Sequence, residues 1–217
     1  MWERYEVRLR FTGRLCGSVP LHKELIKDWV TARAPKNKPD DGPSLDDIQA
    51  EVEQTIEETV EEAEERVTLG FQSDDKGLFL RGGTVKAHLK DCSNQVKDAP
   101  GVGVKALKAK LANRVFVEQD RVYICTGGGD IVQAHTGEFE QPVHVMTARG
   151  PRSALKRIQY VTDVFLNFTL KVLVNKEVTE DILQSVFEYG EIHGYGGERG
   201  MGEGRYRVEK FTKEAEA

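Results

Sequence analysis

The chain contains little cysteine and no long hydrophobic run. Its three cysteines, Cys16, Cys92 and Cys125, lie far apart without a CxxC pair, which argues against a disulfide framework or a zinc knuckle. No apolar stretch approaches the ~20 residues that a transmembrane helix needs. The N-terminal sequence MWERYEVRLR also has no apolar signal-peptide segment. We therefore expect a cytoplasmic protein with no metal ion or other cofactor and no membrane partner.

The chain has no excess of positive charge, because 31 Lys and Arg residues stand against 36 Asp and Glu residues, a formal net charge of −5. This value argues against a generic, uniformly basic nucleic-acid binder. The acidic residues are concentrated, however. Residues 34–66 hold twelve acidic and three basic residues, a net of −9, which leaves +4 for the rest of the chain. A local basic groove can therefore coexist with the negative total.

Hydrophobic periodicity predicts an α+β protein. The chain begins with a strand and a helix and ends with a strand, a helix and a strand, so the simplest candidate is a single domain over residues 1–217. We expect a ferredoxin-like (RRM-like) β-α-β-β-α-β core with an antiparallel sheet. The predicted elements are a strand at 4–12, a helix at 21–33, a strand and helix within 77–91, a helix at 104–113, a hairpin at 115–125, a strand at 163–174, a helix from Thr179 to Gly190 and a strand at 205–211.

The acidic segment predicts an inserted helix at about 36–67. Residues 35–43 have the composition of a linker, and Ser44 is a candidate N-cap. Apolar residues then recur every three or four positions from Leu45 to Val67, opposite a very acidic face. Two interpretations stay open: a solvated helix packed along one seam, or a helix at 44–66 that docks on a protein partner or mimics nucleic acid.

A glycine-rich segment precedes the last predicted strand. Seven of the fifteen residues from Gly190 to Gly204 are glycine. Glycine allows positive φ and a close backbone approach, which suits nests of N–H groups that bind phosphate. Arg199, Arg205 and Arg207 add positive charge there. A Walker A motif and a Rossmann fingerprint are both missing. The alternative is a structural loop packed across the sheet.

Three stretches resemble the RAMP superfamily, the repeat-associated RNA-binding proteins of CRISPR systems. GYGGERGMGEGRYRV (194–208) is similar to the glycine-rich loop that joins the last helix to the last strand in that superfamily. LFLRGGTVKAHLKD (78–91) is similar to its strand-to-helix element, although Ala87 stands where glycine is usual. MTARGPRSALKRIQYV (146–161) resembles the basic segment before a central strand. Small RAMP-like proteins of phages are also similar.

The resemblance implies binding of single-stranded RNA through its backbone, in a multi-subunit complex or oligomer, within a bacterial, archaeal or infected host cell. The chain departs from RNA-coating subunits in its acidic total and its acidic helix. The residues expected at phosphates are Lys86, Lys90, Arg149, Arg152, Lys156, Arg157, Arg199 and Arg205. The glycines expected to clamp the backbone are Gly194, Gly196, Gly197, Gly200, Gly202 and Gly204.

Two alternatives to simple RNA binding stay open. The first is a metal-independent endoribonuclease of the same fold, in which His22 and Lys23 would supply acid, base and cation chemistry. The second is a protein-interaction module, for example a phage factor, that uses the acidic helix. Tyr195 and Tyr206 are candidates for stacking on single-stranded bases.

Overall fold

A computed structural model describes residues 2–21, 66–147 and 150–214. The predicted helix at 21–33, His22 and nearly all of the acidic insertion lie outside these ranges. The chain forms two compact units. The first comprises Met1–Ser18, Phe71–Glu138 and Gln159–Ala217, and the second comprises Val19–Gly70 and Phe139–Ile158. Each unit is described by itself.

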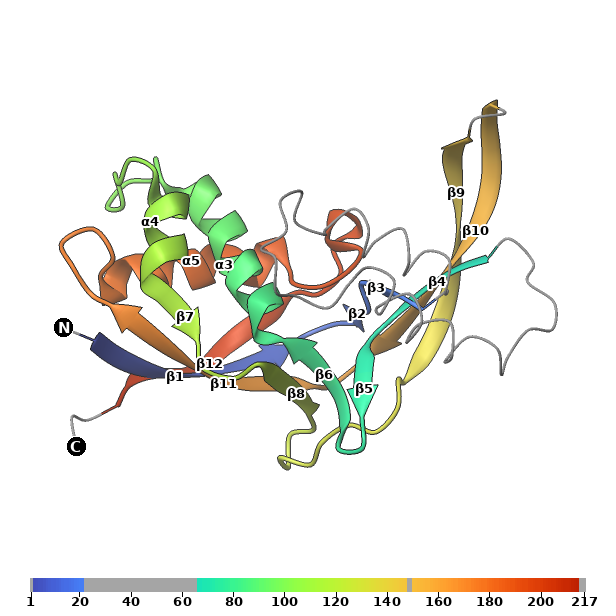
Figure 1. The fold of residues 1–217 in the computed structure, drawn as a ribbon, viewed down its shortest axis with the longest axis horizontal. Helices are drawn as coiled ribbons and strands as arrows, with labels where there is room; N and C mark the ends of the chain where they lie inside the picture. Colours follow the sequence, from blue (N-terminus) through green and yellow to red (C-terminus); the bar gives the residue numbers. More distant parts are fainter. Residues whose placement is uncertain (1, 22–65, 148–149, 215–217) are drawn as a thin grey trace, which may run out of the picture. The chain divides into compact units, whose positions relative to one another are not determined.

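The first unit is built on an antiparallel sheet with helices on one face. Strands follow the order β12-β1-β11-β8-β6-β5, and β7 pairs with β11 as well. Figure 1 shows α3, α4 and α5 on the same face of this sheet. The strands are β1 (Trp2–Phe11), β5 (Gln72–Asp74), β6 (Gly77–Arg81), β7 (Val115–Val117), β8 (Arg121–Cys125), β11 (Phe165–Leu173) and β12 (Tyr206–Lys213), and the helices are α3 (Gly82–Val96), α4 (Leu107–Arg114) and α5 (Glu180–His193).

Strand periodicity determines which side chains enter the core. In β1 the odd-numbered residues from Tyr5 to Phe11 are buried, and in β11 the even-numbered residues from Leu166 to Val172 are buried. The helices supply the opposite layer through residues such as Leu89 of α3 and Leu183 of α5, both fully buried. Each large aliphatic side chain buried in this way contributes roughly 1.5–3 kcal/mol. Hydrophobic burial therefore fixes the helices to one face of the sheet.

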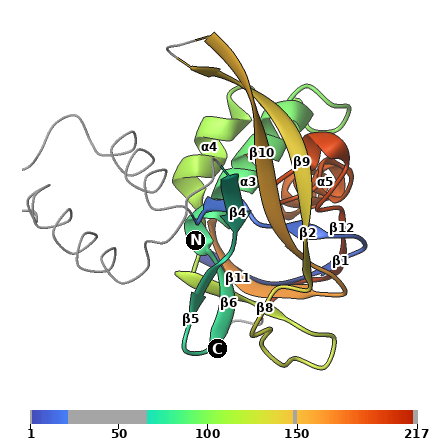
Figure 2. The ribbon, with the colours of Figure 1, turned by 90° about the vertical axis from the view of Figure 1, so that its right-hand side faces the viewer.

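The second unit contains part of a smaller sheet. β3 (Val19–Pro20) pairs antiparallel with β4 (Arg66–Gly70), and β4 pairs in parallel with residues 155–158 of β10 (Gly150–Val161). β9 (Gly137–Thr147) pairs with β10, and Figure 2 shows these two strands running side by side. Within the first unit, the end of β10 pairs with β2 (Leu15–Cys16).

The predicted α+β class with an antiparallel sheet is confirmed. Three local predictions were wrong. Residues 115–125 do not form a hairpin, because β7 and β8 each pair with β11. The helix from Thr179 does not stop at Gly190 but continues to His193, with Gly194 as its C-cap. The end of the predicted acidic helix differs too, since Arg66 and Val67 belong to β4.

Gly190 lies inside α5 because the phenol of Tyr206 occupies the place of a side chain. A Cβ added there would lie 2.0 Å from Oη of Tyr206. No positive φ is involved. The glycine is therefore required by close packing of α5 against β12 and not by a helix end.

We expect Gly190→Ala to destabilise the protein by about 1–3 kcal/mol, the usual cost of overpacking a core. Gly83→Ala in α3 is the matched control, because a Cβ at Gly83 meets nothing within 4 Å. Alanine should leave stability unchanged there or raise it by up to about 1 kcal/mol. Urea unfolding of both variants checks this, and equal stabilities would contradict the packing account.

Candidate functional site

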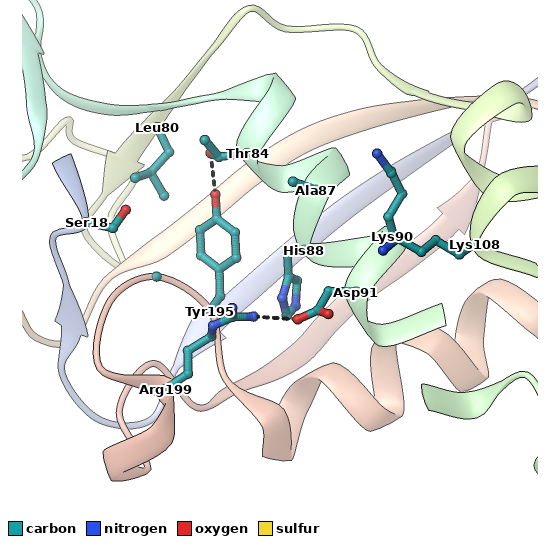
Figure 3. A pocket seen from close by; sticks show the side chains of 11 residues that line it. Ser18, Leu80, Thr84, Ala87, His88, Lys90, Asp91, Lys108, Tyr195 and Arg199 are labelled. Carbon is teal, nitrogen blue, oxygen red and sulfur yellow. Dashed lines mark hydrogen bonds and ion pairs between the residues drawn. The ribbon is translucent and has the colours of Figure 1, made fainter. Parts of the chain in front are cut away.

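A pocket of about 430 Å³ opens between α3 and the glycine-rich segment that follows α5. Figure 3 shows the α3 side chains on one wall and those of the glycine-rich segment opposite them. The segment reaches the pocket through residues 195–199. The lining residues are Ser18, Leu80, Thr84, Ala87, His88, Lys90, Asp91, Lys108, Tyr195, Gly196 and Arg199.

The glycine-rich segment packs directly on backbone, which explains several of its glycines. Gly196 has a φ of +92°, and a Cβ there would lie 2.7 Å from the carbonyl oxygen of Cys16. At Gly204, with a φ of +73°, a Cβ would lie 1.9 Å from the carbonyl oxygen of Tyr195. Since such distances exclude a side chain, the segment docks on β2 and on itself only because these residues are glycine. Gly194 and Gly197 make similar approaches.

Hydrogen bonds hold the docked segment in place. The amide of Gly197 donates to Cys16 O at 2.9 Å, and the amide of Gly204 donates to Arg14 O at 2.8 Å. Backbone carbonyls also accept from the amides of Tyr195, Met201, Gly202 and Glu203. These six amides, and that of Gly194, which donates to Gly190 O at 2.9 Å, are engaged within the protein. A phosphate nest, as predicted from the sequence, would therefore have to use other amides of the segment.

Tyr195 joins the segment to the first turn of α3. The hydroxyl of Thr84 donates to Arg81 O at 2.7 Å, which leaves Oγ1 of Thr84 to accept from Oη of Tyr195, also at 2.7 Å. Tyr195 is buried, and burial raises the pKa of its phenol to about 12. The phenol is therefore neutral and serves as a fixed donor across the pocket floor.

An ion pair closes the other side of the pocket. Nη1 of Arg199 lies 3.0 Å from Oδ2 of Asp91 and 3.0 Å from Nε2 of His193. Nε2 of His193 lies 3.1 Å from the same carboxylate oxygen. Burial raises the pKa of Asp91, but hydrogen bonds from His193 and Arg199 outweigh burial and hold it below its usual value. Asp91 therefore stays ionised and orients Arg199 at the pocket rim.

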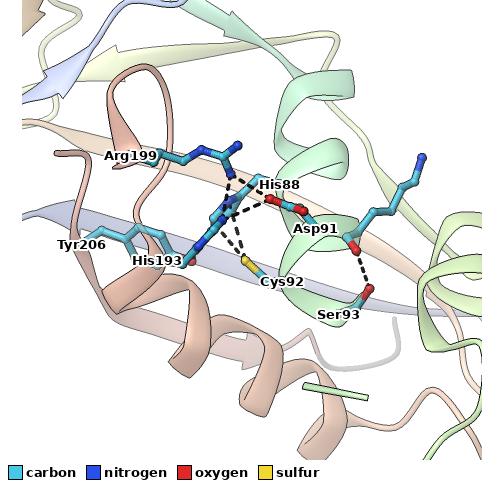
Figure 4. Close-up of polar contacts among 8 residues, drawn as sticks. His88, Asp91, Cys92, Ser93, His193, Arg199 and Tyr206 are labelled. Carbon is cyan, nitrogen blue, oxygen red and sulfur yellow. Dashed lines mark hydrogen bonds and ion pairs between the residues drawn. The ribbon is translucent and has the colours of Figure 1, made fainter. Parts of the chain in front are cut away.

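His88 lies beneath this ion pair and is buried. Figure 4 shows it between Arg199, Cys92 and Tyr206. Its Nε2 lies 3.0 Å from Oη of Tyr206 and 3.6 Å from Sγ of Cys92. Burial, followed by the nearby positive charge of Arg199, lowers the pKa of His88 to about 3. His88 is therefore a neutral core residue near neutral pH.

The charged lining residues give the pocket a positive balance. Lys90 comes from α3, Lys108 from α4 and Arg199 from the glycine-rich segment, while Asp91 is the single carboxylate among the lining residues. Ser18 and Thr84 add hydroxyl groups. This combination suits an anion with several oxygen acceptors, such as a phosphate. Within the described ranges, no cluster of three His, Cys, Asp or Glu residues could hold a metal ion.

The structure brings together three of the residues predicted from the sequence, Lys90, Gly196 and Arg199. Lys86 points elsewhere, with Nζ 3.9 Å from the ring centroid of Phe116. Arg205 lines a different hollow with Thr12 and Arg207. Gly194, Gly197, Gly200, Gly202 and Gly204 lie in the segment but do not line the pocket.

The other predicted residues lie in the second unit or outside the described residues. Lys156 and Arg157 belong to the second unit, where Nη2 of Arg157 lies 2.9 Å from Oε1 of Glu140. Arg149 and His22 lie outside the described residues, as does the side chain of Arg152. Their predicted roles stay predictions.

Sequence reasoning missed Lys108, Asp91 and Ser18. Lys108 is one of several lysines in a short amphipathic helix, and nothing in the sequence singles it out. The proposed stacking role of Tyr195 and Tyr206 was wrong, because both rings are buried in the core. Their hydroxyls contact Thr84 and His88, so both tyrosines act in packing.

Comparison with solved structures finds similarity at the level of the fold. No protein-family model matches the sequence. No curated protein matches it either. A chain of the type III-B Cmr-beta complex bound to cognate target RNA matches in structure with a TM-score of 0.47 and 10% identity. The alignment covers 98% of this chain and 60% of that chain. No helix in the described parts of the chain is long and apolar enough to cross a membrane.

The low pKa of His88 predicts a pH-dependent stability. His88 gains a proton near pH 6.5 in the unfolded state but only near pH 3 in the folded state. The free energy of unfolding therefore decreases as the pH falls through this window. Between pH 7 and pH 5 the wild type should lose about 2 kcal/mol through this residue. In urea titrations, His88→Gln should show a smaller loss. An equal loss in the variant would assign the pH dependence to other groups.

Proposed function

We propose that the chain is an RNA-binding protein and that the pocket between α3 and the glycine-rich segment holds a phosphate of a single strand. The observation that carries this proposal is the convergence of three cations on one pocket. Lys90, Lys108 and Arg199 come from three separate elements and line the pocket together with one carboxylate, Asp91. Phosphates that bridge such cations gain charge-assisted hydrogen bonds.

The fold supports the proposal. The order β12-β1-β11-β7, together with α3 and α5 on one face, agrees with the 4-1-3-2 order expected of a ferredoxin-like core. In that assignment the glycine-rich segment joins the last helix to the last strand. We therefore propose a RAMP-like ferredoxin core, in agreement with the motifs at 78–91 and 194–208.

The wider setting is also a proposal. A RAMP-like chain would work in the cytoplasm, within a larger RNA-bound assembly. The acidic segment at 44–66, with its excess of carboxylates, would bind a basic protein partner and not RNA. Arg149, Arg152, Lys156 and Arg157 would make phosphate contacts of their own, and the glycines of the segment would let the RNA backbone approach closely.

We expect the protein to bind labelled single-stranded RNA in EDTA, with an affinity that falls steeply as the salt concentration rises. Fluorescence anisotropy of the labelled RNA measures this affinity. Each phosphate neutralised on a single strand contributes about −0.7 to the slope of log affinity against log salt. Lys90→Ala combined with Lys108→Ala should weaken binding and make the slope shallower by about 1.4.

Lys176→Ala is the matched control, because Lys176 is exposed in the turn between β11 and α5 and does not line the pocket. It should leave the slope unchanged. Binding that does not respond to salt, or that weakens equally in both variants, would contradict the phosphate site. Shortened RNA would instead indicate the endoribonuclease.

A further inference from the structure

Two aromatic rings lie exposed on the first unit, away from the pocket. Trp2 is 47% exposed and Phe116 is 39% exposed. Their ring centroids lie 5.9 Å apart with an interplanar angle of 60°. Neither ring belongs to the buried core. The two rings therefore form a small exposed aromatic surface on the sheet.

Strand register places Trp2 and Phe116 on the same side of their strands, in the part of the sheet where β7 pairs with β11. Lys171 of β11 pairs with Arg4 of β1 on one side and with Phe116 of β7 on the other. Trp2 pairs with Leu173, two positions along from Lys171. Residues paired in this way share a face, and the alternate residues of β1 and β11 are buried against the helices.

Two lysines flank the rings. Nζ of Lys86 lies 3.9 Å from the ring centroid of Phe116, and Nζ of Lys171 lies 5.3 Å from the ring of Trp2. The nearby carboxylates of Glu118 and Glu214 pair with Arg4, at 2.6 Å and 3.1 Å. We call Trp2, Phe116, Lys86 and Lys171 the aromatic patch.

We propose that the aromatic patch is a second nucleic-acid contact, in which bases of a single strand stack on Trp2 and Phe116 while their phosphates meet Lys86 and Lys171. Aromatic faces interleaved with cations are the chemistry by which proteins hold single strands, because every base has a face to stack and a phosphate to neutralise. The positive charge around the rings distinguishes this occupant from an apolar protein surface.

Helix α3 connects the patch with the pocket. Lys86 and Lys90 are four residues apart, so they are neighbours on one side of the helix. Burial lowers the pKa of the Lys86 ammonium, and the nearby charge of Lys90 lowers it further. Lys90 lines the pocket. In this proposal a strand with a phosphate in the pocket extends along α3 to the patch. In this respect the inference rests on the proposed function.

The test compares a short single-stranded RNA with the same backbone carrying abasic riboses. The two probes present equal numbers of phosphates, so the ratio of their Kd values isolates stacking. The wild-type protein should prefer the base-containing strand by about 5-fold or more, the range expected for one or two stacked bases. Trp2→Ala combined with Phe116→Ala should bring the ratio close to one.

Two controls keep the result specific. Trp2→Phe retains an aromatic face and should keep most of the preference. Ile192→Ala removes another exposed hydrophobic residue, 72% exposed on α5, and should keep all of it. Urea unfolding should confirm that every variant has wild-type stability.

The outcomes separate the two proposals. If the double variant keeps the preference, or the wild type binds both probes equally, the patch is not a stacking site, although the pocket proposal stands. If the wild type binds neither probe, both proposals fail. A concentration-dependent dimer that the double variant abolishes would assign the patch to a second copy of the chain and overturn the inference.

Discussion

The site depends on the close contact between the glycine-rich segment and the backbone of β2. Gly196 and Gly204 sit where any Cβ would collide with a carbonyl oxygen, so the contact exists only without side chains. Once docked, the segment fixes Tyr195 against Thr84 and Arg199 against Asp91. The position of the pocket therefore follows from a packing requirement, and the charged groups around it are held by that packing.

The same contact explains why the buried polar groups are neutral. Tyr206 and His88 lie beneath the segment and form a hydrogen-bonded pair without charge, next to Cys92. Burial raises the pKa of Tyr206 and of Cys92 and lowers that of His88, so each keeps its uncharged form near neutral pH. The fixed charges stay at the rim, on Asp91 and Arg199, where solvent and a ligand can reach them. A neutral floor beneath a charged rim leaves the cations available for an incoming anion.

Much of the fold was predictable because β1, β11 and α5 carry clear alternation or helical spacing. The hairpin at 115–125 was predicted wrongly since its two strands find their partner in β11, a contact distant in sequence. Gly190 was wrongly predicted to end the helix, because its role depends on Tyr206, sixteen residues later. For the site, Lys90 and Arg199 were identified by motif. Lys108 and the exposed pair Trp2 and Phe116 were missed, because each acquires its setting only through tertiary packing.

Photocrosslinking tests the central claim most directly. A photoreactive single-stranded RNA, bound at low salt and analysed by mass spectrometry, should attach to peptides from residues 84–91, 107–114 and 195–205. Such crosslinks would place the RNA at the pocket between α3 and the glycine-rich segment. Crosslinks confined to other parts of the chain, from RNA that is bound at the same salt, would contradict the account.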